Sequence, residues 1–375
     1  MLHWEKGRVL AELEGWAGVQ RLLVQLDAPG AESVRALAYP ELTGAIAEGE
    51  TVLLNTNALR RGLGTGGDAL VVARADPPHG AQPAPAGHMV KTRYTPMQTI
   101  VDAIDDPASP HYPVMRSAQS LERMPVVVAD LHSSLPAIIA GIRAERPGAR
   151  VAYVMTDSAA LPAAYSRTVA ALREADWIDA CISAGQAFGG DLEAVSIHSA
   201  LLGAHHVVRA DVAIAIQGPG NLGTGTGWGF SGAAGIEALH AAHTLGGRPV
   251  AALRVSSGDA RERHHGLSHH SATVLGAGVL APVDLPLPAM PHSGFWLSVG
   301  EQLNNAVIVP AIERGVRHRI HRVSTSGLLE SLHGAPVRLS TMGRGLEEDS
   351  ESFLAAAAAG RHAAALLDAE GRSRD

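Results

Sequence analysis

The chain has 375 residues, of which 46% are hydrophobic and 18% are charged, and its formal net charge is −7. This composition is typical of a globular protein, and the length indicates two domains or one large domain with an appendage. The acidic charge argues against nucleic acid as a partner of the whole molecule, and the single cysteine, Cys181, excludes an intrachain disulfide and a cysteine-based zinc site. No apolar run approaches the roughly 18 residues of a membrane span and the amino terminus lacks a secretory pattern, so we expect a cytoplasmic protein with no membrane partner.

Residues 1–75 are predicted to form a small β-barrel. Four or five short apolar or alternating runs are separated by turn residues such as Pro29 and Gly30. Small barrels of this kind serve as docking modules or as structural appendages. The next stretch, 76–124, is interpreted as a linker and crossing segment, because the proline-rich part at 75–88 can neither pair in a sheet nor continue a helix.

Residues 125–375 are predicted to form a mainly parallel, doubly wound α/β domain with a C-terminal helix. Continuous apolar runs alternate with amphipathic segments, as expected for a parallel sheet covered on both faces. The predicted strands are 126–130, 151–155, 178–183, 212–217, 250–255 and 318–323, with 279–283 as a further candidate. The predicted helices are 135–146, 161–175, 192–208, 233–245, 268–275, 297–314 and 347–366, with Asp191 and Ser268 as N-caps. A closed βα barrel is the alternative, since six or seven βα units are predicted.

The stretch from Asp211 to Gly232 is the most informative part of the sequence. An apolar strand, 212–216, opens into a loop that holds seven glycines between Gly218 and Gly232. Glycine lets the backbone approach a ligand closely, so the amide N–H groups of this loop are predicted to hold a phosphate or a carboxylate. The predicted ligand-binding residues of the loop are Gly218, Gly220, Asn221, Gly223, Thr224, Gly225 and Thr226.

Three other interpretations of this loop differ in how well the sequence fits them. A P-loop is excluded because no G-K-[ST] follows the glycines. A dinucleotide fingerprint matches only weakly, because the helix does not open within the motif. A purely structural glycine loop remains as the competing interpretation.

Polar side chains follow most of the predicted strands. Asp130 and His132 follow 126–130, Asp157 follows 151–155, and Gln186 follows 178–183. Ligands of open parallel sheets bind outside the carboxyl ends of the strands, so we expect these side chains to share one edge with the glycine loop. Each of them alone is also explained as a helix cap or a turn residue.

The segment from Arg261 to His270, RERHHGLSHH, packs four histidines and two arginines into ten residues. If Ser268 caps a helix, the helix dipole favours the neutral imidazole that a metal ion or a general base requires. The predicted ligands of a divalent metal (zinc, manganese or iron) are His264, His265, His269 and His132. The predicted catalytic residues are His269, His270, Asp130 and Asp157. Arg261, Arg263 and Gln186 are predicted to contact an anionic ligand. Catalysis without a metal and solvated surface histidines are the alternatives.

Six motifs spread over the chain resemble an uncharacterised bacterial family, the domain of unknown function 3866 type. The motifs are LLNTNALRRGLGTGG, MVKTRYTPMQ, GQAFGGDLEAV, GPGNLGTGTGWGFSG, RHHGLSHH and STMGRGLEEDSESFLAAAAAG. The resemblance covers nearly the whole chain. It implies no activity, and no catalytic residue is taken from it.

The leading hypothesis is a small-molecule enzyme that performs metal-assisted hydrolysis or group transfer on an anionic metabolite, for example a phosphorylated one. The alternative is a non-catalytic protein that binds a nucleotide-like ligand or regulates a partner docked on the barrel. A third hypothesis, an RNA-contacting barrel, is disfavoured because the sequence lacks an interleaved aromatic and basic stripe. The sequence is compatible with a homo-oligomer and does not specify one.

Overall fold

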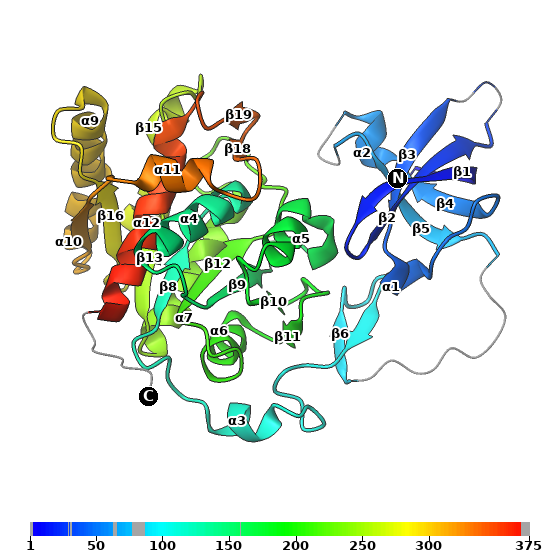
Figure 1. Cartoon of the computed structure of the whole chain (residues 1–375), viewed down its shortest axis with the longest axis horizontal. Helices are drawn as coiled ribbons and strands as arrows, with labels where there is room; N and C mark the ends of the chain where they lie inside the picture. The colour runs from blue at the N-terminus through cyan, green and yellow to red at the C-terminus, as the bar shows by residue number, and fades with distance from the viewer. Residues whose placement is uncertain are drawn as a thin grey trace.

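The computed structural model describes residues 3–28, 30, 32–62, 66–76, 87–157 and 159–368. A small barrel and a larger α/β domain lie at opposite ends of the molecule in Figure 1. Most of the proline-rich stretch predicted to link them, 75–88, lies outside the described residues. No helix within the described ranges is long and apolar enough to cross a membrane.

The predicted N-terminal barrel is confirmed. Its strands are β1 (Trp4–Trp16), β2 (Val19–Leu26), β3 (Ser33–Ala38), β4 (Thr51–Asn55) and β5 (Ala69–Arg74), closed in the order β1-β2-β3-β5-β4. β3 and β5 run parallel and the other pairs run antiparallel. Alternate apolar side chains, such as Leu22, Val24 and Leu54, fill the interior. The strand order and the parallel pair are those of the OB-fold, with short helices α1 (Pro40–Thr43) and α2 (Asn57–Arg60) in its loops.

A connecting segment leads from the barrel to the sheet. It contains β6 (Met89–Lys91), β7 (Thr99–Val101) and α3 (Tyr112–Ser117). Lys91 is fully buried and pairs with Glu193, with 3.0 Å between Nζ and Oε2. The segment is therefore attached to the α/β domain through a buried ion pair.

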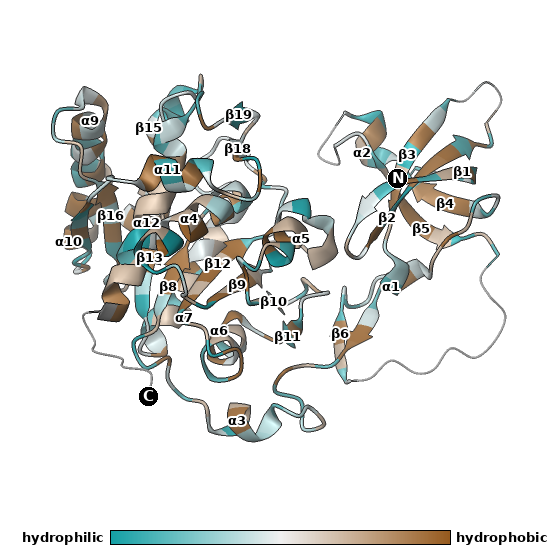
Figure 2. Cartoon of the chain, in the orientation of Figure 1, coloured by the Kyte–Doolittle hydropathy of each residue, from teal (hydrophilic) through white to brown (hydrophobic). Residues whose placement is uncertain are grey.

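The α/β domain is built on an open, eight-stranded parallel sheet, which rules out the closed βα barrel. The order of the strands is β11-β10-β9-β12-β8-β13-β16-β17, and the central ones are uniformly apolar (Figure 2). Their bounds are β8 (Pro125–Val128), β9 (Val151–Thr156), β10 (Ala180–Ala184), β11 (Leu192–Ala194), β12 (Val212–Gln217), β13 (Arg248–Ala251), β16 (Asp284–Pro288) and β17 (Arg319–Val323). Burial on both faces explains why the central strands lack alternation.

Helices cover both faces of the sheet. The longer ones are α4 (Leu135–Glu145), α5 (Arg167–Glu174), α6 (Ile197–His206), α7 (Gly235–Thr244), α9 (Gly294–Leu303) and α12 (Ser350–Asp368). The shorter ones are α8 (His269–Thr273), α10 (Val309–Glu313) and α11 (Leu328–His333). α4 packs against α11 and α12, while α6 packs against α7. Because the crossovers after β8 and β12 run in opposite directions along the sheet, right-handed connections place α4 and α7 on opposite faces.

Three sequence predictions of elements were wrong. The helix predicted from residue 192 begins with the short strand β11 and starts only at Ile197, where Ser196 is the N-cap in place of Asp191. The strand predicted at 279–283 lies at Asp284–Pro288. The helix predicted over 297–314 is interrupted by a π-helical stretch, Asn304–Ile308.

The direction of the crossovers reverses at one point of the sheet, between β8 and β12. β8 and β12 are neighbours, but the chain leaves them toward opposite faces. Open α/β sheets bind ligands outside the carboxyl ends of strands at such a point. Asp130 follows β8 and the glycine loop follows β12, so both lie at this position.

Candidate functional site

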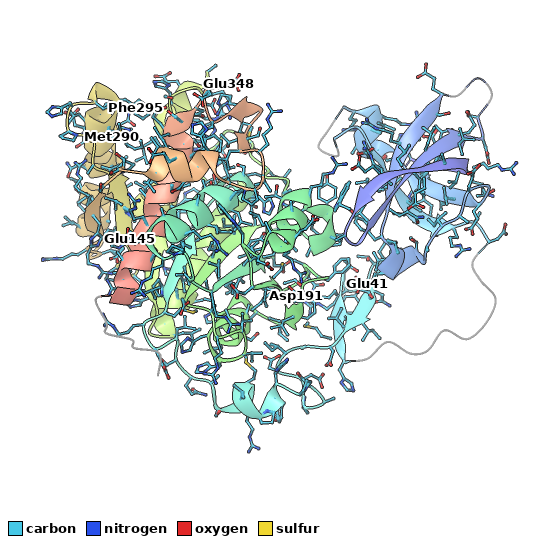
Figure 3. The ribbon with its side chains drawn as sticks, in the orientation of Figure 1. Glu41, Glu145, Asp191, Met290, Phe295 and Glu348 are labelled. Carbon is cyan, nitrogen blue, oxygen red and sulfur yellow. The ribbon has the colours of Figure 1, made fainter. Side chains whose placement is uncertain are left out.

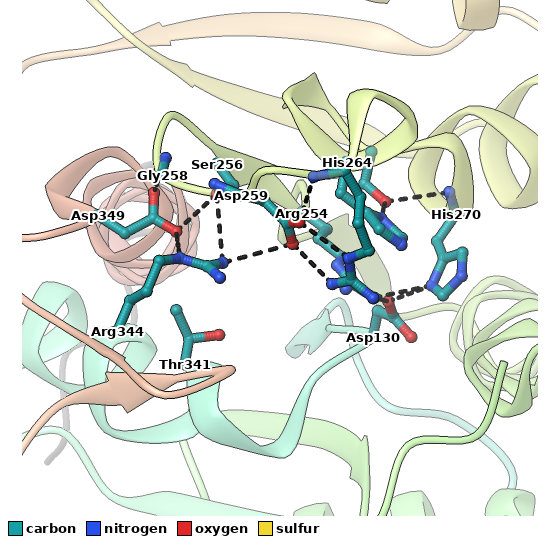
Figure 4. Close-up of polar contacts among 12 residues, drawn as sticks. Asp130, Arg254, Ser256, Gly258, Asp259, His264, His270, Thr341, Arg344 and Asp349 are labelled. Carbon is teal, nitrogen blue, oxygen red and sulfur yellow. Dashed lines mark hydrogen bonds and ion pairs between the residues drawn. The ribbon is translucent and has the colours of Figure 1, made fainter. Parts of the chain in front are cut away.

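Asp130 is the point at which the glycine loop and the histidine segment meet. Its Oδ1 accepts a hydrogen bond from Asn221 Nδ2 at 3.0 Å. Its Oδ2 lies 2.8 Å from His270 Nδ1 (Figure 4). The loop is bound to the histidines a second time by Phe230, which stacks on His270 with 3.8 Å between ring centroids. The two segments that the sequence singles out therefore share one rim of the sheet.

Arg254 completes the environment of Asp130. Its Nη1 lies 2.6 Å from Asp130 Oδ2 and 2.8 Å from His270 Nδ1. Burial alone would raise the pKa of Asp130, but the hydrogen bond from His270 and the Arg254 charge hold it below its ordinary value. An ionised carboxylate only accepts hydrogen bonds, so Arg254 donates to Asp130, and Asp130 also accepts from His270 in the tautomer with the proton on Nδ1. In that tautomer Nε2 of His270 carries the lone pair.

His264 is also held by a hydrogen-bond partner, in this case Ser268, the N-cap of α8. Ser268 caps the helix by accepting from the His270 amide at 3.2 Å, as predicted, and its Oγ lies 2.8 Å from His264 Nδ1. Burial lowers the pKa of His264 to about 3, and burial also lowers the pKa of His269. Both rings are therefore neutral at physiological pH and offer a lone pair.

One ligand atom from each of His264, His269 and His270 lies within 4.8 Å of the other two. Nitrogen ligands of a tetrahedral zinc ion lie about 3.3 Å apart, given bonds of about 2.0–2.1 Å, so a small closure of the rings would suffice. Nε2 of His269 is buried and has no hydrogen-bond partner among the described residues. These three residues, called the histidine cluster below, could hold a metal ion, and Asp284, His321 and His362 form a second group of this kind among the described residues.

The other two predicted metal ligands lie elsewhere. His265 is exposed and its ring meets the edge of Phe295 at 6.2 Å. His132 Nε2 lies 2.7 Å from Ser166 Oγ and its Nδ1 lies 3.3 Å from the Tyr153 hydroxyl. Gly266, directly after His265, has a φ of 71°, a left-handed conformation that glycine adopts easily. The chain turns at this residue, and His265 lies outside the cluster.

Asp157 and Gln186 also lie apart from the histidine cluster. They line a separate cleft of about 680 Å³ together with His88 and Arg93. Gln186 accepts a hydrogen bond from the Arg93 amide, and burial raises the pKa of Asp157. The structure therefore does not bring Asp157 to the predicted catalytic position.

The predicted anion-binding residues divide into two groups. The loop from Gly218 to Thr226 is largely exposed. Arg263 lies beside it: Nη1 of Arg263 is 3.6 Å from the position that a Cβ atom on Gly225 would occupy. Arg261, in contrast, is engaged by Asp259 at 2.7 Å. The hydroxyls of Thr224 and Thr226 bond to one another and to Gly229, so they support the loop itself.

Sequence reasoning missed a second ion network that continues from the site. Arg344 joins Asp349 at 3.0 Å and Asp259 at 3.5 Å, and Ser256 donates to Asp349 at 2.6 Å. Figure 4 shows this network extending alongside Arg254 and His270. The signals in the sequence were Ser256 and Asp259, which follow the strand predicted at 250–255, and the motif around Arg344, STMGRGLEED, which carries no known chemistry.

The comparisons with known proteins give a family and no function. A family model described as "Protein of unknown function (DUF3866)" matches residues 35–360 of the 375. No curated protein matches the chain, and no solved structure matches it.

Proposed function

Because the chain belongs to the DUF3866 family of unknown function, we propose its function from the site alone: it is a divalent-metal-dependent enzyme acting on a small anionic molecule. The observation that carries this proposal is the histidine cluster, His264, His269 and His270, with the buried and unpartnered Nε2 of His269. A buried polar atom without a partner costs free energy, so its position calls for a ligand.

The surroundings of the histidine cluster support a metal centre. Metal-bound histidines commonly present their second ring nitrogen to a carboxylate or another acceptor, which fixes the tautomer. Asp130 has this relation to His270, and the Ser268 hydroxyl has it to His264. Zinc is the preferred ion for three neutral imidazoles, with manganese and iron as alternatives. Three protein ligands leave a coordination position for water, as in catalytic zinc sites.

An anionic substrate is favoured by the charges around the cluster. Arg254, Arg261 and Arg344 all have carboxylate partners in the structure. Arg263 is exposed beside the glycine loop and has no ion pair among the described contacts. Arg263 and the loop amides could together hold a phosphate or carboxylate next to His269.

The chemistry that follows is hydrolysis or group transfer. A bound divalent metal lowers the pKa of its water toward 7 and supplies a nucleophile at neutral pH. The glycine loop and Arg263 would hold the anionic part of the substrate, while Phe230 fixes the plane of His270 by stacking. We place this activity in the cytoplasm, and a homo-oligomer remains compatible with it.

Ligand binding without turnover is the competing function. Asp130 is held by Arg254, His270 and Asn221, so this carboxylate is not free to accept a proton from a substrate or a water. A regulatory protein that senses the same anion through the same residues would need no general base. Turnover by the metal-loaded protein separates the two functions.

The test is metal content and affinity of the full chain. Purified protein is stripped with a chelator, titrated with Zn²⁺ or Mn²⁺, and assayed by elemental analysis and calorimetry. We expect about one ion per chain. His269→Ala should weaken binding by more than the roughly 10- to 100-fold typical of losing an outer-shell partner. The metal-loaded wild type should then hydrolyse chromogenic phosphate esters, and the stripped protein should not.

His265→Ala is the matched control, because His265 is the adjacent imidazole but lies outside the cluster. It should bind metal as the wild type does. Equal loss in both variants, or no stoichiometric ion in the wild type, would contradict the metal centre. Stoichiometric binding without turnover would favour the sensing function instead.

A further inference from the structure

A second constellation lies at the junction of the barrel and the α/β domain, and the proposed metal chemistry does not use it. Ser166, the N-cap of α5, has its Oγ 2.7 Å from His132 Nε2. His132 Nδ1 in turn lies 3.3 Å from the hydroxyl of Tyr153, a fully buried residue of β9. Tyr153 donates its own proton to the Ile216 carbonyl at 3.2 Å. These contacts form a chain that runs from the sheet to the start of α5, where Ser166 is buried.

One tautomer of His132, with the proton on Nδ1, gives every group in this chain a donor or an acceptor. In it Tyr153 donates to the Ile216 carbonyl, and the Tyr153 oxygen accepts from His132 Nδ1–H. The Nε2 of His132 is then the acceptor for the Ser166 hydroxyl proton. The Ser166 oxygen still accepts the Val169 amide at 3.1 Å, which fixes its position. A serine whose proton points at a neutral, oriented imidazole is the arrangement of an activated nucleophile.

Ser166 lies in the wall of a cleft that both domains line. This cleft has a volume of about 300 Å³, and its walls include Ser166, His132 and Tyr165 on one side and Trp16 and Leu37 of the barrel on the other. Ser166 also lines a larger cleft of about 1050 Å³ between the same domains. A volume of 300 Å³ suits a small ligand. Trp16, Leu37 and Tyr165 give the cleft apolar surface for a short acyl group, and Arg21, Asp68 and Arg167 add charged groups to its walls.

We propose that Ser166 is a nucleophile, activated by His132, that accepts the acyl group of a small carboxylic ester in this cleft. Ser166 Oγ attacks the carbonyl carbon while its proton passes to His132 Nε2. The bond to the alcohol then breaks, and the alcohol leaves with the proton from His132. Water, deprotonated by His132, attacks the acyl-serine, releases the carboxylic acid and restores the Ser166 hydroxyl.

The first turn of α5 supplies donors for the oxyanion formed in this step. The first N–H groups of a helix have no partner within the helix. Among the described hydrogen bonds, none uses the amides of Arg167 or Thr168, whereas the Val169 amide is taken by Ser166. Backbone donors aimed at a developing negative charge are a main source of catalysis in acyl transfer.

The test is covalent labelling of the full chain with a fluorescent alkyl fluorophosphonate. The serine oxygen displaces fluoride from phosphorus, so the probe reports nucleophilicity without a known substrate. We expect labelling at a single site, mapped to Ser166 by mass spectrometry, and a rate at least 10-fold lower in His132→Gln. Ser166→Asn should abolish labelling while it keeps the helix cap, since asparagine caps helices as well as serine does.

Ser133→Ala is the matched control, because Ser133 is next to His132 but its hydroxyl contacts Thr341 at 3.2 Å. This variant should label at the wild-type rate. Labelling should also be unchanged by a chelator, so its outcome is independent of the metal centre. No labelling of the folded wild type, labelling at another serine, or an unchanged rate in His132→Gln would overturn the proposal.

Discussion

His132 is surrounded by hydroxyl groups and by the sheet, and burial lowers its pKa to about 4. An unfolded histidine has a pKa near 6.5. Between these two pH values the unfolded chain binds a proton at this residue and the folded chain does not. The free energy of unfolding must therefore fall as the pH decreases from about 6.5 to about 4, and it is unaffected by His132 above that window.

This contribution predicts the behaviour of His132→Gln. The wild type should lose on the order of 2 kcal/mol more stability than the variant between pH 7 and pH 4.5, at up to about 1.36 kcal/mol per pH unit. Urea denaturation at both pH values measures the difference. If the two proteins lose stability in parallel, the folded His132 takes up its proton near the ordinary pH and is not buried as described.

The residue types of the candidate site could be predicted from the sequence, but their arrangement could not. The polar residues after the strands and the histidine-rich segment were visible in the sequence, since both stand out by composition. Which histidines converge could not be predicted. His264 and His265 are adjacent in the sequence, but only His264 belongs to the histidine cluster. The residues that follow them, β15 (Gly266–Leu267), pair antiparallel with β14 (Val255–Ser256), and this pairing sets the path of the chain from the two histidines to the start of α8. This path depends on the pairing of β14 with β15, and no local sequence pattern predicts that pairing.

At the scale of elements, α4 and α12 pack closely against each other. Gly141 of α4 and Gly360 of α12 allow it, because a methyl group at either position would overlap a carbonyl oxygen of the other helix, at Ala357 and Ile138 respectively. α12 is rich in alanine and buries nearly all of the run at 353–359. Small residues let the two backbones approach as closely as they do.

Gly141→Ala should therefore be strongly destabilising, although alanine favours helices. We expect a loss of about 1–3 kcal/mol or more in the free energy of unfolding, because the helices must separate to admit one methyl group. Gly148→Ala is the control, since no atom lies within 4 Å of the added carbon there, and it should stay within about 0.5 kcal/mol. Urea titration of both variants decides; equal stability would mean that the helices are not in contact at Gly141.

Element prediction succeeded where burial is uniform and failed where elements are short or irregular. β8, β9 and β12 are continuous apolar runs, and their positions followed directly from the sequence. β11 has only three residues and precedes a helix, so its residues appeared to extend that helix. The π-helical stretches at Val274–Gly278 and Asn304–Ile308 pack against each other, and that contact has no signature in either segment alone.

At the scale of the whole molecule, the barrel contacts the α/β domain mainly through one corner. Trp16, at the end of β1, donates from Nε1 to the Ala164 carbonyl at 2.7 Å, and the Arg167 guanidinium lies 4.1 Å from its ring centroid. Figure 3 labels Glu41 of α1 and Asp191 of the α/β domain, on the sides where the two domains face each other. The OB-fold order could not be predicted, because pairing of β3 with β5 skips a strand.

Trp16→Ala should loosen this junction without unfolding either domain. Loss of one hydrogen bond and one cation–π contact removes about 1.5–2 kcal/mol of docking free energy, which raises the undocked population roughly 10- to 30-fold. Small-angle X-ray scattering should then give a larger radius of gyration than the wild type. Trp4→Ala is the matched control, because Trp4 is an exposed residue of the same strand without a described contact to the α/β domain, and its scattering should be unchanged. An unchanged radius in Trp16→Ala would mean that contacts other than this corner hold the barrel in place.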